Sequence, residues 1–480
     1  MAAGLDGSAE TLLSVEALMQ PDSCESCHSG HYREWASSMH AYSTQDPIFL
    51  AMEARGQELT GGELGPFCVQ CHAPLAVALG LVQTGADLAE LEDPSLGSVN
   101  CYFCHTVSGV PTSFANPLDL PANNPLILEE GTSVLRAGLK EAESAGAHEV
   151  AYSELLDGRE LTSAAMCGAC HDVVTPAGLH LERTFAEWEI TPTADPQSNR
   201  AGQNTCNDCH MLARQAPAAR VAERSLPIRT VHSHLFEGVD VALTTHPDQD
   251  IQKLAIQCAM RTAALINSLQ VSPADGSLTI VAETPIGHGF PSGATQDRRA
   301  WLEITITDRA GNVRQIGHVP EGVPLVQALA LEENARMVTY YDEMFDADDA
   351  PTHNFWEAAS MTQRTLPAPG TAGGHTQVHR VPVFNPAAPE DTWPARIEVT
   401  MYVRPVGLDV VQDLLDSGHL QDEALLEAIP TFEVTGAHVY WDMTEHALWD
   451  EVRAPVPDGL RCPAQYRCEL YPEECAEDEG

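Results

Sequence analysis

The chain has 480 residues, and 44% of them are hydrophobic, which is an ordinary share for a folded protein. Its 69 acidic residues outweigh 25 basic ones, so the formal net charge is -44. A field of that sign repels nucleic acids and anionic membrane surfaces, and we exclude nucleic acids as partners.

The first residues do not form a recognisable targeting segment. Residues 1–20, which we treat as an N-terminal segment, lack a basic region followed by an apolar core, so we expect no secretion signal in them. Farther along, no run approaches the roughly 18 apolar residues that span a bilayer. We therefore expect no transmembrane segment.

Five copies of one cysteine pattern follow. Ten of the 14 cysteines form the pattern Cys-x-x-Cys-His between positions 24 and 210, where chance would give about 0.02 copies. Two thiols at this spacing reach the two vinyl groups of one porphyrin, and the next imidazole reaches its iron. We predict five haem c groups, attached through Cys24, Cys27, Cys68, Cys71, Cys101, Cys104, Cys167, Cys170, Cys206 and Cys209.

The histidine that closes each motif is the predicted proximal iron ligand. These ligands are His28, His72, His105, His171 and His210. Zinc ribbons also use Cys-x-x-Cys pairs, but they need two pairs per metal and no histidine directly after each pair. Redox dithiols occur singly in a βαβ context, and disulfides across two-residue gaps are strained. Haem attachment is the interpretation that we keep.

The other histidines can supply sixth ligands, which would close the irons to substrates. His40 ends the segment 31–41, which is typical of a short helix, and a surface role is its alternative. His148 precedes the fourth motif. His288 lies in a Gly/Pro-rich loop, where stabilising the turn is the alternative role.

Three more histidines lie close to motifs or to one another. His232 and His234 share one side of an extended stretch, and we prefer His234 as the distal ligand. His31 follows the first proximal histidine by three residues, too few to fold back over the same haem. His31 and His232 are therefore the weaker distal candidates.

These segments resemble a known family. The run CESCHSGHYREWASSMHA, residues 24–41, resembles the first haem segment of multihaem cytochromes related to the tetrahaem electron acceptor of hydroxylamine oxidoreductase. The stretches MCGACHDVVTPAG, RTFAEW, TCNDCHM, HLFEG and GHGFPSGATQDRRAWLEITITDRAG resemble a larger group of exported multihaem cytochromes in which a haem domain precedes a β-rich domain. The likeness covers about residues 20–310.

The resemblance implies haems with two histidine ligands, stacked in alternating parallel and perpendicular pairs. It implies a distal role for His40 and, secondarily, for His148, His234 and His288. Some relatives keep one iron open and carry out nitrogen or sulfur redox chemistry. The resemblance to pentahaem nitrite reductases with a lysine-ligated haem is poor, because all five motifs here end in histidine.

The later chain has a different character. We predict a pentahaem domain at 21–248 and, from helical periodicity and alanine content, a linking helix at 249–270. From 271 to 460, β-branched runs alternate with Gly/Pro/Asp-rich turns, which favours an antiparallel β-sandwich with a helix at 408–418 before the last strand. The predicted fold class is α+β.

Four cysteines remain outside the motifs. They are Cys258, Cys462, Cys468 and Cys475, and the last three lie in an acidic tail at 461–480. In an oxidising compartment they can form one or two disulfides. Three tail cysteines cannot pair fully among themselves, so a bridge to Cys258 is one arrangement that we consider.

We favour an electron carrier over an enzyme and leave the second open, because five closely spaced haems are typical of an electron conduit. The C-terminal half shows no complete catalytic constellation. The chain would transfer electrons between redox partners in respiration, in the periplasm or outside the cell, and cytochromes with basic faces would suit its charge. One alternative is an oxidoreductase of a small nitrogen or sulfur compound at a five-coordinate haem. The other is a homo-oligomer or filament whose distal histidine comes from the next copy.

Overall fold

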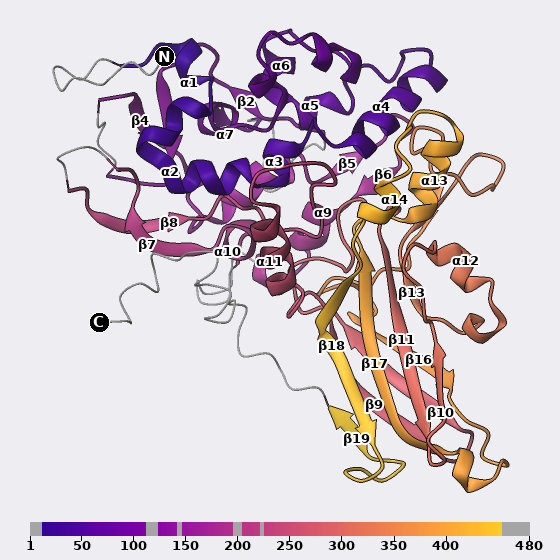
Figure 1. Cartoon of the computed structure of the whole chain (residues 1–480). Coiled ribbons are helices and arrows are strands. Elements are labelled where there is room, and N and C mark those ends of the chain that lie inside the picture. Colours follow the sequence, from indigo (N-terminus) through magenta and orange to yellow (C-terminus); the bar gives the residue numbers. More distant parts are fainter. Residues whose placement is uncertain (1–11, 112–122, 142–145, 195–203, 221–224, 454–480) are drawn as a thin grey trace. The chain divides into compact units, whose positions relative to one another are not determined.

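A computed structural model describes residues 12–111, 123–141, 146–194, 204–220 and 225–453 (Figure 1). The chain forms two compact units that interleave along the sequence. Unit 1 consists of the described residues of Met1–Gln45, Gly65–Cys170 and Thr205–Phe236, and unit 2 of those of Asp46–Leu64, His171–Asn204 and Glu237–Gly480. Two stretches of the predicted haem domain, 46–64 and 171–204, thus belong to unit 2. The domain boundaries expected from the sequence stay predictions.

Unit 1 is built from short helices and two-stranded sheets. Its α-helices are α1 (Val15–Leu18), α2 (Asp22–Ala36), α3 (Met39–Tyr42), α5 (Val69–His72), α6 (Pro74–Ala78), α7 (Cys101–Thr106), α8 (Ala164–Gly168) and α10 (Cys206–His210). Its 3-10 helices are η1 (Gly85–Glu90), η2 (Pro94–Gly97), η3 (Glu154–Leu156) and η4 (Leu161–Ser163). Its strands are β1 (Val107–Gly109), β2 (Ile127–Leu128), β3 (Val134–Ala137), β4 (Glu149–Tyr152), β7 (Ala213–Pro217) and β8 (Ile228–His232).

The described part of unit 1 contains a small apolar cluster in which Leu18, Leu75, Tyr102 and Phe103 are buried together. Tyr102 and Phe103 lie inside the third motif, so this cluster packs directly against a predicted haem-attachment site. A chain segment with five such motifs has little room for a large core of its own. The porphyrins would supply much of the missing apolar contact.

Unit 2 holds the long strands. Its helices are α4 (Pro47–Leu59), α9 (Thr184–Glu189), η5 (Pro192–Ala194), α11 (Gln249–Ala259), α12 (Leu325–Leu329), η7 (Glu332–Asn334), η8 (Glu390–Thr392), α13 (Leu408–Asp416) and α14 (Leu425–Ala428). Its strands are β5 (Val173–Val174), β6 (His180–Glu182), β9 (Leu265–Ser272), β10 (Ser277–Glu283), β11 (Arg299–Asp308), β12 (Val313–Ile316), β13 (Thr339–Tyr340), β14 (Glu343–Phe345), β15 (Ser360–Thr362), β16 (Thr376–Pro382), β17 (Pro394–Arg404), β18 (Phe432–Asp442) and β19 (Glu451–Arg453).

Two antiparallel sheets organise unit 2. One has the strand order β16-β10-β9-β19, and the other has the order β12-β11-β17-β18 with β13 paired to β11. Figure 1 shows β11, β17 and β18 side by side, and Val399 of β17 pairs with Ile304 on one side and Val439 on the other. Buried side chains of both sheets form one core, including Leu269 and Ile280 from the first sheet.

The structure confirms a mixed fold of helices and sheet, with mainly short helices in the N-terminal part and a sheet-rich C-terminal part. The sandwich arrangement itself stays a prediction. The helix between the last two long strands is present as α13. No helix among the described ranges is long and apolar enough to cross a bilayer.

Two helix predictions need correction. The linking helix expected at 249–270 ends at Ala259, and strand β9 already begins at Leu265. The burial of β9 alternates only in part, so its apolar residues imitate helical periodicity in the sequence. The segment 31–41 is divided between α2 and α3, because the Ser38 hydroxyl accepts a hydrogen bond from the Ala41 N–H and starts a new helix.

Candidate functional site

The five motifs lie on short helical turns or directly after one. The first lies inside α2, and the others lie on or follow α5, α7, α8 and α10. A helical turn puts two cysteines three residues apart on one face, as attachment to one porphyrin requires. Local caps fix two of these turns, since Asn100 accepts from the Phe103 N–H at 3.0 Å and Thr205 with Asp208 forms a capping box.

Helix α2 is broken at the histidine of its motif. His28 has φ -113° and ψ 40°, which are not helical values, although residues on both sides are helical. The break redirects the backbone at the residue that must present its imidazole. The Nδ1–H of His28 then donates to the Ala218 carbonyl oxygen at 2.8 Å, from a segment 190 residues later.

The motif histidines share a pattern of hydrogen bonds at Nδ1. Backbone carbonyl oxygens accept from three of them: Ala218 from His28 at 2.8 Å, Ser43 from His72 at 3.2 Å, and Arg136 from His105. His171 differs, because its Nδ1 lies 3.1 Å from the Glu182 carboxylate. These oxygens can only accept, so Nδ1 carries the proton and Nε2 keeps the lone pair that binds a metal.

Four of the candidate distal histidines show the same pattern. Their Nδ1 atoms donate to carbonyl oxygens: His148 to Glu149 at 3.0 Å, His232 to Met211 at 2.9 Å, His234 to His232 at 3.0 Å and His288 to Gly289 at 2.9 Å. Two histidines outside the candidate set, His180 and His379, instead use Nε2, which meets Asp172 in His180 and the Tyr340 hydroxyl at 2.9 Å in His379. With Nδ1 as the donor, the four candidates carry the lone pair on Nε2, the nitrogen that would bind a metal.

Two pairs of imidazoles in unit 1 have rings within 30° of parallel at a distance suited to one metal between them; His31 also lies 6.2 Å from His28, but its ring is tilted by 51°. The ring centres of His28 and His148 lie 6.2 Å apart at an interplanar angle of 30°, and those of His105 and His234 lie 6.4 Å apart at 15°. Two metal–nitrogen bonds of about 2.0–2.1 Å, plus about 1.1 Å from each nitrogen to its ring centre, give about 6.3 Å. Both pairs combine a motif histidine with a predicted distal one.

Burial favours the neutral form of three of these imidazoles, those of His28, His105 and His234. It lowers the pKa of His28, against the Ala218 carbonyl, which raises it. Burial likewise lowers the pKa of His105 and of His234, and neighbouring histidines lower the pKa of each further. Iron ligation requires the neutral imidazole, so the surroundings favour the protonation state that a haem ligand needs.

In unit 2, His171 and His288 are neighbours. Burial lowers the pKa of His288, and the nearby His171 lowers it further. The loop of His288 is fixed by helix α9, because the Gly289 N–H donates to Glu187 at 2.9 Å. A Cβ on Gly287 would lie 3.0 Å from Cδ1 of Trp188, so the loop runs directly over this helix.

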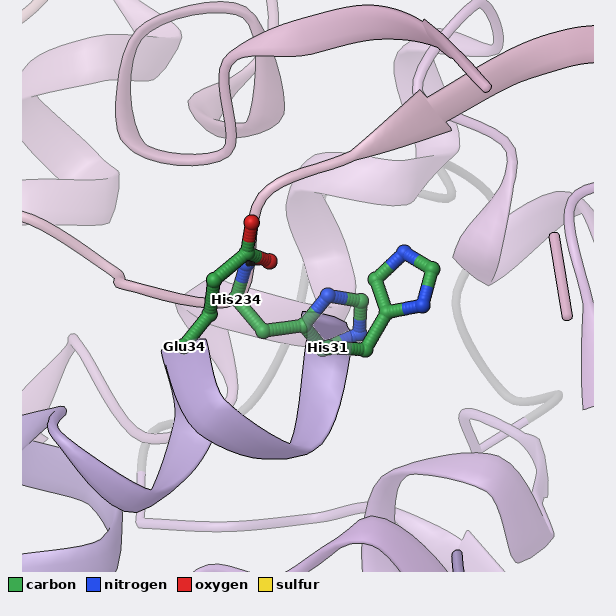
Figure 2. A group of neighbouring side chains, drawn as sticks. All are labelled: His31, Glu34 and His234. Carbon is green, nitrogen blue, oxygen red and sulfur yellow. Dashed lines mark hydrogen bonds between the residues drawn. The ribbon is translucent and has the colours of Figure 1, made fainter. Parts of the chain in front are cut away.

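His31, Glu34 and His234 form a group whose ligand atoms lie within 4.8 Å of one another, with Glu34 buried and the two imidazoles partly buried (Figure 2). The Glu34 carboxylate is already engaged, since Oε1 accepts from Arg214 at 3.1 Å and Oε2 accepts from the His234 backbone N–H at 2.9 Å. A cation here would compete with the Arg214 guanidinium. Glu34 therefore fits better as the group that positions the His234 backbone.

The rings of His31 and His234 are 4.8 Å apart at 69°, too close for a metal between them. Burial, Arg214 and the surrounding histidines lower the pKa of His31 to about 3, so this imidazole is neutral. The ring of His40 packs on Phe236 at 4.4 Å. Distal roles for His31, His40 and His232 stay predictions.

The motif thiols of unit 1 lie close to one another. None of the ten motif cysteines forms a disulfide. Hydrogen bonds join Cys24 to Cys101, Cys71 to Cys170 and Cys167 to Cys206, and so connect motifs far apart in sequence. Burial raises the pKa of Cys104 to about 12. Cysteines outside disulfides, beside imidazoles with an Nε2 lone pair, fit haem c.

One functional residue was missed from the sequence. Glu182 contacts His171, yet only the β5–β6 hairpin, in which Val173 pairs with Glu182, brings the two together. The turn residues Thr-Pro-Ala-Gly between two β-prone runs were the available indication. Of the non-motif cysteines, Cys258 is disulfide-bonded, whereas Cys462, Cys468 and Cys475 lie outside the described residues.

Comparison with known proteins agrees with this geometry. Residues 23–106, which contain the first three motifs, match the family model described as cytochrome c554 and c-prime. This segment resembles a multihaem cytochrome. The solved structure of a penta-heme cytochrome c552 from Thermochromatium tepidum matches with a TM-score of 0.54 and 17% identity, over 91% of this chain and 100% of that chain. That likeness shows the fold, and no curated protein matches the chain.

Proposed function

We propose that this chain is a pentahaem c-type cytochrome that transfers electrons between redox partners outside the cytoplasm. The observation that carries the proposal is the pairing of His28 with His148 and of His105 with His234. Each pair spans the distance of two axial ligands on one metal, and each includes the histidine of an attachment motif. A haem c held in this way supplies a one-electron couple.

The proposed axial ligands follow from these contacts. His148 would lie opposite His28, His234 opposite His105, and His288 opposite His171. For the second and fifth motifs, His40, His31 and His232 remain the proposed candidates. Two imidazoles at an iron leave no position for a substrate, which supports electron transfer over conversion of a small nitrogen or sulfur compound.

The protein's own part in this function is to bring the sites together. Thiol contacts link the first motif to the third, the second to the fourth, and the fourth to the fifth. Cys104 of the third motif also lies near enough to Cys167 of the fourth for the two to interact electrostatically. Cofactors attached at such neighbouring positions can exchange electrons through the chain, which supports a conduit.

The acidic charge supports a basic partner, because an excess of carboxylates attracts a positively charged face before contact. Attachment through thioethers and the disulfide at Cys258 support a location in the periplasm or outside the cell, where thiols are oxidised. The proposal does not need a particular donor. The relation to the tetrahaem partner of hydroxylamine oxidoreductase remains part of the proposal.

The test is the spectroscopy of the purified holoprotein. Alkaline pyridine spectra should give five haem c per chain, and the oxidised protein should be low-spin at the haems of the first, third and fourth motifs. Cyanide should leave those three unchanged. A count below five would overturn the pentahaem proposal, and a high-spin signal assigned to one of those three haems would overturn its proposed ligation. Conversion of a nitrogen or sulfur compound at that iron would favour the enzyme alternative.

A further inference from the structure

We propose that Glu182 acts through His171 to make the haem of the fourth motif harder to reduce than it would be with a carbonyl at that position. Glu182 is a positioning residue, because it contacts the ligand rather than the iron. The inference rests on the proposed function, since it requires that His171 binds the fourth haem. It assigns to one haem a distinct role in the transfer of electrons.

The contact is built into the fold of unit 2. Strands β5 and β6 form a hairpin. In it Val173, which lies two residues after His171, pairs with Glu182. Oε1 of Glu182 lies 3.1 Å from Nδ1 of His171. The chain just after the hairpin also holds the His171 backbone, because the Phe185 N–H donates to the His171 carbonyl at 3.0 Å.

This carboxylate distinguishes His171 from three other motif histidines. His28, His72 and His105 each donate to a neutral backbone carbonyl. An ionised acceptor makes a hydrogen bond about twice as strong as a neutral one, and a carboxylate behind an imidazole makes it a more basic ligand. A more basic ligand stabilises the oxidised iron, so the reduction potential of that haem falls.

The same short segment fixes the proposed ligand on the other side. Helix α9 follows Glu182 directly, and Glu187 on it accepts from the Gly289 N–H beside His288 at 2.9 Å. Arg183 lies 3.5 Å from Glu187 and 2.7 Å from Asp342, so the charge of Glu187 has a basic neighbour. The Glu182 carboxylate lies against the ligand imidazole; its Oε1 also accepts from the Thr184 hydroxyl at 3.5 Å, and its charge acts on Arg298.

The decisive variant is Glu182→Gln in the full-length holoprotein, followed by potentiometric titration with optical and electron paramagnetic resonance detection. The equilibrium constant for reduction of one haem should rise about tenfold, which corresponds to a reduction potential higher by about 59 mV for one electron. Tenfold is the lower end of the effects of removing a group that contacts a metal ligand. The low-spin resonance of the same haem should change. A Cys167→Ala/Cys170→Ala variant identifies the transition by its loss.

The matched control is Asp172→Asn. Asp172 is the next residue after His171 and loses the same charge on substitution, but its carboxylate contacts His180. The control should shift the fourth haem much less than Glu182→Gln, and Glu182→Asp should retain part of the native potential. Equal shifts in Glu182→Gln and Asp172→Asn would show a general charge effect and overturn the role of the ligand contact.

Haem content and reversible reduction, measured on the same samples, separate the two proposals. If five haems are present and reducible but Glu182→Gln leaves every potential and resonance unchanged, the inference about Glu182 fails and the cytochrome remains. If the unsubstituted protein lacks the fourth haem, the proposed function fails first. Glu182→Asp keeps the test open where Glu182→Gln folds poorly.

Discussion

Replacing His234 by alanine tests the axial pairs directly. His234 faces the motif histidine His105 across 6.4 Å with rings nearly parallel, and its own position is held by Glu34 and by the His232 carbonyl. The H234A variant removes the imidazole and leaves the backbone contact to Glu34 possible. We expect the iron of the third motif to lose one ligand.

The size of the effect follows from the geometry. One of five haems should change from low-spin to high-spin, about 20% of the total haem, because His234 pairs with a single motif histidine. His31 cannot take over, since its ring meets that of His234 at 69° and 4.8 Å. The affected haem should also become easier to reduce, because an imidazole ligand that lowered its potential is gone.

Carbon monoxide binding to the reduced protein is the assay. H234A should bind one additional molecule per chain relative to the unsubstituted protein, and H379A, a control at a histidine outside the candidate set whose Nε2 contacts Tyr340, should bind none in addition. The reverse outcome, with a new site in H379A and none in H234A, would refute the use of ring spacing to assign ligands.

Three further predictions concern unit 2 and the surface. Arg299 forms a buried ion pair with Asp409, so R299A should lower the free energy of unfolding by about 3–5 kcal/mol in denaturant titration. The control R309A breaks an exposed pair with Glu390 and should lower it by less than about 1 kcal/mol. Similar losses in the two variants would contradict the role of burial. His353 lies between Asp409 and Asp413, and although burial acts to lower its pKa, these carboxylates raise it above 6.5. Because the folded pKa of His353 exceeds its unfolded pKa, its contribution to stability is complete below pH 6.5 and is lost as the pH rises through the folded pKa. The unfolding temperature of the unsubstituted protein should therefore fall over this pH range, and that of H353Q should fall less. An equal fall in H353Q would exclude His353 as its source. Affinity for a basic cytochrome should fall as ionic strength rises, and an affinity independent of salt would mean that the charge serves solubility alone.

The local chemistry of the haem motifs is readable from the sequence, whereas their surroundings are not. Spacing alone predicts the thiols and proximal imidazoles, and the long strands such as β17 follow from β-branched alternation. The acceptors behind the imidazoles come from distant segments, such as Ala218 for His28, and a backbone carbonyl carries no residue type to recognise. The break after Ala36 depended on a cap by Ser38, which competes with helical continuation.

The interleaving of the two units has a consequence for how the chain can be divided. Ala51 of α4 packs with Leu408, Val411 and Leu414 of the C-terminal part, so a fragment that starts at 237 would lack part of its own core. The chain passes between units at 45/46, 64/65, 170/171, 204/205 and 236/237. During synthesis, α4 must therefore wait for partners made more than 300 residues later. The sheet-rich part is therefore not a separable appendage, because its core is completed by a helix that is made before four of the five motifs.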